Sequence, residues 1–179
     1  MTLILILLFV LGGLVFKTKF LIFSLAALAV LLFFHNRYDS KSLILSFLIS
    51  LIWSVFSVDI YNYSFSFKFF GFFDVFPFLA FGIGLYGSWY IFYSLISYLK
   101  VKKLNLRLEF LIYTFFYITI LLFGEWLFYH YVGVQNIATA AYPPLAICNC
   151  LHAPPAMAGI YMAMGPLFFI LNTNLNKYL

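Results

Sequence analysis

Glu125 is the side chain in this sequence with the clearest potential for chemistry. It lies in the apolar run 119–128, seventeen residues beyond Leu108. A carboxyl group in such a run must be paired, hydrated or protonated, because an ionised carboxylate in hydrocarbon costs several kcal/mol. In a helix, Glu125 and Tyr129 share a face, whereas His130 points about 140° away from Glu125. The position predicts an acid or base that faces a cavity or a lipid-soluble substrate; the simpler interpretation is a carboxyl hydrogen-bonded to a neighbouring helix.

Acid/base chemistry needs a second group, because one residue gives a proton and another accepts one. The sequence offers three further candidates for this role, which are Asp59, Asp74 and His130. Aromatic side chains nearby are candidates for lining an apolar substrate pocket, and their faces stabilise developing positive charge; they are Trp126, Tyr129 and Tyr142. Together these residues favour proton transfer to or from a lipid or isoprenoid-like substrate.

A second group of chemically versatile side chains is formed by Cys148, Cys150 and His152. In extended backbone the three would face the same way, and thiolates with an imidazole suit Cu(I) or zinc. Established zinc motifs pair two such clusters, however, so we expect buried, inert cysteines, with a copper or zinc site and a redox or catalytic role as alternatives. A disulfide between Cys148 and Cys150 is not expected, because the intervening loop is short. The sequence itself requires no cofactor.

Composition determines the class of protein that must position these groups. Of 179 residues, 66% are hydrophobic and only 8% are charged, against about 45–50% and about 25% in soluble domains. Fifteen charged residues cannot cover the surface of a 20.8 kDa soluble globule. The ten basic residues form no aromatic-interleaved patch, which argues against nucleic-acid binding. The chain is therefore expected to be an integral, multi-pass membrane protein.

The apolar segments predict an all-α bundle of about six transmembrane helices within a single membrane domain, residues 1–179. A spanning helix needs about 17–25 mostly apolar residues. Six segments qualify or come close, at 2–16, 20–34, 42–58, 73–99, 108–132 and 156–171. The first two are short and form a predicted hairpin around Lys17-Thr18-Lys19. The beginning of the chain lacks the features of a cleavable signal peptide, so none is expected.

Residues 133–155 cannot form one continuous helix, because the pairs Pro143-Pro144 and Pro154-Pro155 interrupt it. We expect a non-helical re-entrant or capping loop, since backbone of this apolarity is tolerated near a bilayer only when protein buries it. Counting basic residues places both termini in the cytoplasm and this loop outside, with seven on the inner side and three on the outer. The candidate acids, His130 and the cysteine loop then all fall in the outer half.

Stripes of small residues predict how the helices pack. Serines recur with helical spacing on the segment 42–58, and small residues recur on the segment 73–99. Such faces let helix backbones approach closely. The residues are Ser42, Ser46, Ser50, Ser54 and Ser57 on the first segment, and Ala80, Gly84 and Ser88 on the second. The aromatic stretch 60–68 alternates like a strand but has no evident partner, so we expect an interfacial loop.

Three functional hypotheses remain open at this stage. The first is an intramembrane enzyme that applies acid/base chemistry to a hydrophobic small molecule. The second is a non-catalytic subunit of a larger membrane complex, with a membrane protein or a second copy of this chain as its partner. The third is a small transporter or a copper- or zinc-handling membrane protein. In all three hypotheses the protein lies in the lipid bilayer.

Overall fold

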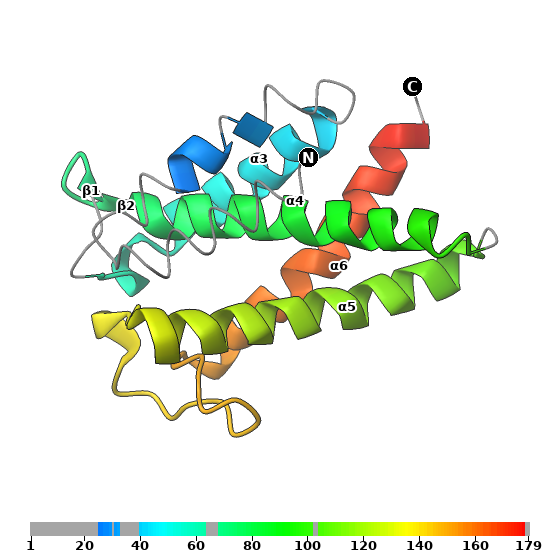
Figure 1. Cartoon of the computed structure of the whole chain (residues 1–179). Coiled ribbons are helices and arrows are strands. Elements are labelled where there is room, and N and C mark those ends of the chain that lie inside the picture. Colours follow the sequence, from blue (N-terminus) through cyan, green and yellow to red (C-terminus); the bar gives the residue numbers. More distant parts are fainter. Residues whose placement is uncertain (1–24, 30, 33–39, 64–67, 102–103, 178–179) are drawn as a thin grey trace.

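The computed structural model describes residues 25–29, 31–32, 40–63, 68–101 and 104–177 (Figure 1). Four long helices follow one another in this part of the chain: α3 (Ser40–Phe56), α4 (Val75–Tyr98), α5 (Leu106–Leu127) and α6 (Pro155–Lys177). Residues 25–29 and 31–32 are also helical. The predicted span 2–16 and most of the span 20–34 lie outside the described residues.

Three of these helices are long and apolar enough to cross a membrane, namely α4, α6 and α5 with the turn that follows it. Helix α3 is equally apolar but has only 17 residues. The chain is mostly helical, and the length and composition of these three helices are consistent with an integral membrane protein. The predicted total of six spans is not established by the described residues.

Helix ends follow local capping chemistry. The carboxylate of Asp74 caps α4 by accepting a hydrogen bond from the Phe76 amide at 3.1 Å, and the side chain of Asn105 caps α5 by accepting one from Leu108 at 2.8 Å. Helix α5 ends in one π-helical turn (Phe128–Val132), which Gly133 terminates with a φ of 75°. Glycine adopts this left-handed conformation without the steric cost of a Cβ atom.

Two sequence-based expectations for α6 are wrong. From the sequence, the sixth span (156–171) is expected to be interrupted at Gly165-Pro166 and to end near residue 171, whereas the helix runs through Pro166 without a break and continues to Lys177. Its far end is held in the bundle, because the Ser42 hydroxyl donates a 3.0 Å hydrogen bond to the side-chain oxygen of the buried Asn172. Neighbouring helices of this kind make an internal proline tolerable in a membrane helix.

The predicted serine face of α3 is confirmed as a packing face. All five of its serines are buried, and the Ser50 hydroxyl donates to the carbonyl oxygen of Phe78 on α4 at 2.6 Å. On α4, Ser88 of the predicted face is buried with its hydroxyl 3.3 Å from that of Tyr113 on α5, whereas the close contact with α3 is made by Gly82 against the Phe47 ring. Gly84 instead has open space beside it and lines a cavity.

Helices α4 and α5 lie side by side, α3 packs on α4, and α6 crosses them at a steep angle (Figure 1). Aromatic rings from three helices fill the crossing, with Trp89 of α4 in edge contact with Tyr113 of α5 and with Phe168 and Phe169 of α6. One end of the bundle carries the hairpin of β1 (Lys68–Phe69) and β2 (Phe73–Asp74) and the segment 133–154, which follows α5 (Figure 1).

The aromatic stretch after α3 does find pairing partners, contrary to expectation. Strand β1 (Lys68–Phe69) pairs antiparallel with β2 (Phe73–Asp74). Tyr63 forms a bridge with Asn136, and the Ile137 amide donates to the carbonyl oxygen of Asn62 at 2.9 Å. The partner therefore comes from a loop more than seventy residues away, which local periodicity cannot reveal.

Replacing Gly165 by valine is expected to destabilise the bundle. A Cβ atom at this position would overlap the ring of Tyr117 on α5. Overpacking of this kind costs about 1–3 kcal/mol, which we expect to see as a lower unfolding temperature of the detergent-solubilised protein. Gly159→Val on the same helix is the matched control, because open space surrounds Gly159. Equal unfolding temperatures for the two variants would contradict the described contact between α5 and α6.

Candidate functional site

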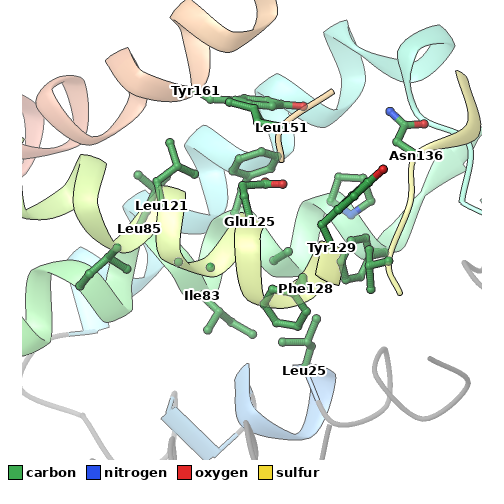
Figure 2. Close-up of a pocket in the computed structure, with 18 of the residues that line it drawn as sticks. Leu25, Ile83, Leu85, Leu121, Glu125, Phe128, Tyr129, Asn136, Leu151 and Tyr161 are labelled. Atoms are coloured by element: carbon green, nitrogen blue, oxygen red, sulfur yellow. The ribbon is translucent and has the colours of Figure 1, made fainter. Parts of the chain in front are cut away.

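A partly enclosed cavity of about 330 Å³ lies between α4 and α5. Lining residues run from Phe76 to Ile91 along α4 and from Tyr117 to Tyr129 along α5. At about 1.5 Å per residue, the α4 wall alone is about 22 Å long. Leu25, Leu28 and Leu32 close one side, and α6 and the segment 133–154 add further wall (Figure 2). The cavity is thus long enough for a single extended chain.

The two ends of the cavity differ in chemistry. Near the end of α5 its lining includes the polar side chains of Gln135, Asn136, Thr139 and His152. Farther along, the lining is mostly aliphatic, from Leu28, Leu32, Leu85, Ile91 and Ile120. An amphiphilic molecule fits this gradient, with its polar end at the loop and its chain between the helices.

Glu125 lines this cavity, as does Tyr129 one turn farther along α5. The Glu125 side chain is partly exposed and belongs to the cavity wall. It makes no hydrogen bond or ion pair with any other residue that the structure describes. Figure 2 shows the carboxyl group directed into the space between Tyr161 and Tyr129. The predicted shared face of Glu125 and Tyr129 is therefore the cavity wall.

A hydrogen-bonded aromatic network holds the wall opposite Glu125. The Trp53 indole donates to the Tyr61 hydroxyl at 2.5 Å, and the hydroxyls of Tyr61 and Tyr161 lie 2.7 Å apart. The Tyr117 hydroxyl donates to the carbonyl oxygen of Tyr161 at 2.9 Å. Burial raises the pKa of the Tyr61 phenol above its usual value, so this hydroxyl stays neutral at physiological pH. The network fixes Tyr161 in place across the cavity from the carboxyl group.

His152 is a second titratable group at the cavity wall. Its Nδ1 atom lies 2.8 Å from the backbone carbonyl oxygen of Tyr142, and its ring stacks on that of Tyr129 with centroids 4.9 Å apart. Because a carbonyl only accepts hydrogen bonds, Nδ1 is the donor in this contact, and Nε2 is the ring nitrogen left to accept a proton. His152 therefore offers a proton acceptor at the polar end of the cavity.

The other candidate acids and bases do not line the cavity in the described part of the chain. Asp59 is exposed in a short 3₁₀ turn (Val58–Ile60), and Asp74 is buried as the cap of α4. His130 is exposed, with Nε2 3.4 Å from the carbonyl oxygen of Cys148. Glu125 and His152 thus line the same cavity, which sequence spacing did not indicate.

Two of the side chains predicted to line a substrate pocket, those of Trp126 and Tyr142, are not among the described residues that line the cavity. Trp126 packs against the rings of His130 and Tyr131, with centroids 6.0 and 5.1 Å away, and is not among the described lining residues. The side chain of Tyr142 is exposed, and only its backbone carbonyl serves the site by orienting His152. Tyr129 alone of the three lines the cavity.

The expectation for the cysteines is wrong: Cys148 and Cys150 form a disulfide, with their Cα atoms 5.1 Å apart. The loop does not follow the extended path that was assumed. Asn149 and Leu151 have left-handed φ angles of 47° and 54°, and the Leu145 amide donates to the Cys150 carbonyl at 2.8 Å. This tight turn brings the two cysteine side chains close enough for their sulfur atoms to bond.

The disulfide bears directly on the predicted copper or zinc site. Both cysteines are oxidised, so no free thiol remains to join His152. Among the described residues, no group of three or more His, Cys, Asp or Glu side chains is arranged to hold a metal ion. The copper or zinc site stays a prediction that this geometry does not favour.

Comparison of the chain with protein-family models, with curated proteins and with solved structures found no match.

Proposed function

We propose that this chain is an integral membrane enzyme that holds a single-chain lipid or isoprenoid-like substrate between α4 and α5 and acts on it by proton transfer from Glu125. One observation carries the proposal: a carboxyl group with no described partner faces an elongated, mostly apolar cavity. Ionisable groups inside membrane proteins are costly and most often functional. A purely structural carboxyl would be expected to have a hydrogen-bonding partner.

The reaction that fits these groups is isomerisation of an alkene. The Glu125 carboxyl gives its proton to one alkene carbon, whose π electrons form the new C–H bond and leave a cation at the adjacent carbon. Loss of a proton from a carbon next to the cation, to Nε2 of His152, restores an alkene at a shifted position. Transfer of that proton from His152 to the Glu125 carboxylate resets the site, so atoms and charge balance over the cycle.

The cavity supplies what such a step needs besides the proton. Aromatic faces stabilise the transient positive charge, and the rings of Tyr161 on α6 and Tyr129 in the π turn lie on either side of the Glu125 carboxyl in Figure 2. The apolar walls keep out bulk water, which would otherwise capture the cation. The mostly aliphatic end of the cavity holds the remainder of the chain.

Lipid mass spectrometry of whole membranes tests this proposal. Membranes of cells that produce the wild-type chain are compared with membranes of cells that produce Glu125→Gln. We expect one hydrophobic species to accumulate and an isomer of the same mass to disappear in the variant. Glu109→Gln is the matched control on the same helix, because Glu109 bonds the Tyr93 hydroxyl at 2.5 Å and is not among the described lining residues. Identical lipid profiles for wild type and Glu125→Gln would contradict the proposal.

The disulfide supports the proposed orientation, with the segment 133–154 on the outer side of the membrane and both termini in the cytoplasm. Disulfides persist in oxidising compartments and are rare in the cytosol. The two cysteines of the disulfide are the only ones in the sequence, which makes a sidedness assay unambiguous.

Intact cells treated with a membrane-impermeant phosphine reductant and an impermeant maleimide are expected to show two labelled cysteines per chain. Without the reductant, no labelling is expected, because both thiols are in the disulfide. A Cys148→Ser/Cys150→Ser variant provides the background signal. Labelling that requires permeabilised cells would place the loop in the cytoplasm and reverse the proposed orientation.

A further inference from the structure

The charge around the cavity is one-sided. Among the described lining residues, Glu125 is the only acidic side chain, and there is no lysine or arginine. A phosphate or other anionic headgroup would find no lysine or arginine there to pair with, although such groups depend on charge-assisted hydrogen bonds. A positively charged group would instead give the Glu125 carboxylate the partner that a buried charge requires.

Aromatic rings line the same cavity as Glu125. Seven phenylalanine and tyrosine side chains line the described cavity wall: Tyr63, Phe76, Phe81, Tyr117, Phe128, Tyr129 and Tyr161. The hydroxyls of Tyr63, Tyr117 and Tyr161 lie within electrostatic reach of Glu125. Phe128 and Tyr129 follow Glu125 at the helical spacings of three and four that bring side chains together; in Figure 2 Tyr129 lies on the side of the carboxyl group, whereas the Phe128 ring lies next to Leu25. A carboxylate among aromatic faces is the combination that proteins use to bind ammonium groups.

The shape of the cavity indicates that its ligand also carries a long apolar chain. From Glu125 to Tyr117 the lined face of α5 extends over eight residues, or about 12 Å. The α4 residues Leu85 and Ile91 line the mostly aliphatic end. A headgroup beside Glu125 therefore leaves room for a single alkyl or isoprenoid chain in one direction.

We infer that the cavity binds single-chain amphiphiles with a tertiary or quaternary ammonium headgroup next to Glu125, and that it selects them over uncharged and phosphate-bearing analogues. The inference rests on the proposed function, because the ammonium is the stable counterpart of the cation that proton transfer to an alkene creates. It also makes a claim about binding that is independent of turnover.

Three photoreactive probes test the inference in phosphatidylcholine nanodiscs that contain the full chain. Each probe has the same dodecyl chain with a diazirine near its end; the headgroups are a dimethylammonium, a hydroxyl and a phosphate. Labelling is measured by mass spectrometry of peptides from 76–91 and 117–129. The ammonium probe is expected to half-saturate labelling at a concentration about tenfold or more below the other two, the order of effect that desolvated cation–π and ion-pair contacts produce.

Variants assign the selectivity to one carboxyl group. Glu125→Gln is expected to bring the ammonium and hydroxyl probes to equal half-saturation while the hydroxyl probe still labels the cavity peptides. Glu109→Gln is expected to retain the tenfold preference. Labelling of Gly84→Phe, in which the new ring fills the cavity, gives the background from probe dissolved in the bilayer.

Several results would overturn the inference. For the wild type, these are half-saturation at the same concentration by the ammonium and hydroxyl probes, or tightest binding by the phosphate probe. The inference is also overturned if Glu125→Gln retains the ammonium preference, or if the cavity peptides of the wild type are labelled no more than those of Gly84→Phe. The lipid comparison described above separates this outcome from failure of the proposed function. Unchanged lipid profiles together with a retained ammonium preference would refute the enzyme but keep the cation site; the opposite pair of results would refute the cation site alone.

Discussion

Replacing Glu125 by glutamine is expected to lower the rate of the proposed reaction by about 10²–10⁴-fold, the usual contribution of a positioned general acid. Glutamine keeps the size and shape of the side chain but cannot give up a proton to the substrate. Because the described structure has no hydrogen bond to this carboxyl, the substitution breaks no contact there, and we expect unchanged insertion and unfolding temperature. The measurement is conversion of the accumulated lipid species by purified protein.

Two further variants make this result specific. Glu125→Asp retains the carboxyl group but withdraws it by one methylene, so its activity is expected to lie between those of the wild type and Glu125→Gln. Glu109→Gln is expected to retain activity, since its hydrogen bond to Tyr93 lies away from the cavity. A Glu125→Gln protein that converts the lipid at the wild-type rate would show that Glu125 is not the acid.

Replacing Gly84 by phenylalanine is expected to abolish substrate binding and turnover while leaving the fold intact. Gly84 lies on the cavity wall, and no atom comes within 4 Å of a Cβ atom built at this position. The phenylalanine ring therefore enters the cavity rather than a packed contact and occupies the path of the chain. Co-purified lipid, measured by mass spectrometry of extracts, is expected to fall to the level of bulk membrane lipid.

Gly159→Phe is the control for Gly84→Phe, because Gly159 also has open space beside it but is not among the described lining residues. We expect this control to keep its bound lipid and its activity. If Gly84→Phe retained both while its unfolding temperature matched that of the wild type, the space between α4 and α5 would not be the substrate site.

The helices could be predicted from the sequence because membrane insertion is a local property. An apolar run of sufficient length is enough to indicate a helix, and the segments 73–99 and 108–132 match α4 and α5 with its π turn to within about two residues. The serine face of α3 was equally accessible, since helical spacing alone brings Ser46 and Ser50 to one side. These inferences need no knowledge of distant residues.

What the sequence did not reveal depends on contacts between distant residues. The end of α6 follows from Asn172 bonding Ser42, 130 residues earlier, and the partner of Tyr63 is Asn136. The disulfide depends on left-handed backbone at Asn149, a conformation that asparagine adopts more readily than most residues. The Asn between the two cysteines was thus the one local signal for the turn.

The candidate site was predictable only along α5. Periodicity placed Glu125 and Tyr129 on one face, and that face lines the cavity. It could not show that His152 stacks on Tyr129 or that Tyr161 and Tyr117 form the wall, because these contacts join residues from α5, α6 and the loop between them. Oxidation of both cysteines also separates His152 from the metal-binding hypothesis and leaves it available as a base.

The most direct test of the account is the mass spectrum of lipid extracted from purified Glu125→Gln protein, compared with that from purified Gly84→Phe. The first variant keeps the cavity but lacks the acid, so its extract is expected to contain one single-chain hydrophobic species, near one molecule per chain and far above its abundance in the membrane. The second variant is expected to lack that species. Extracts that both match bulk membrane lipid would contradict the claim that the cavity beside Glu125 is a substrate site.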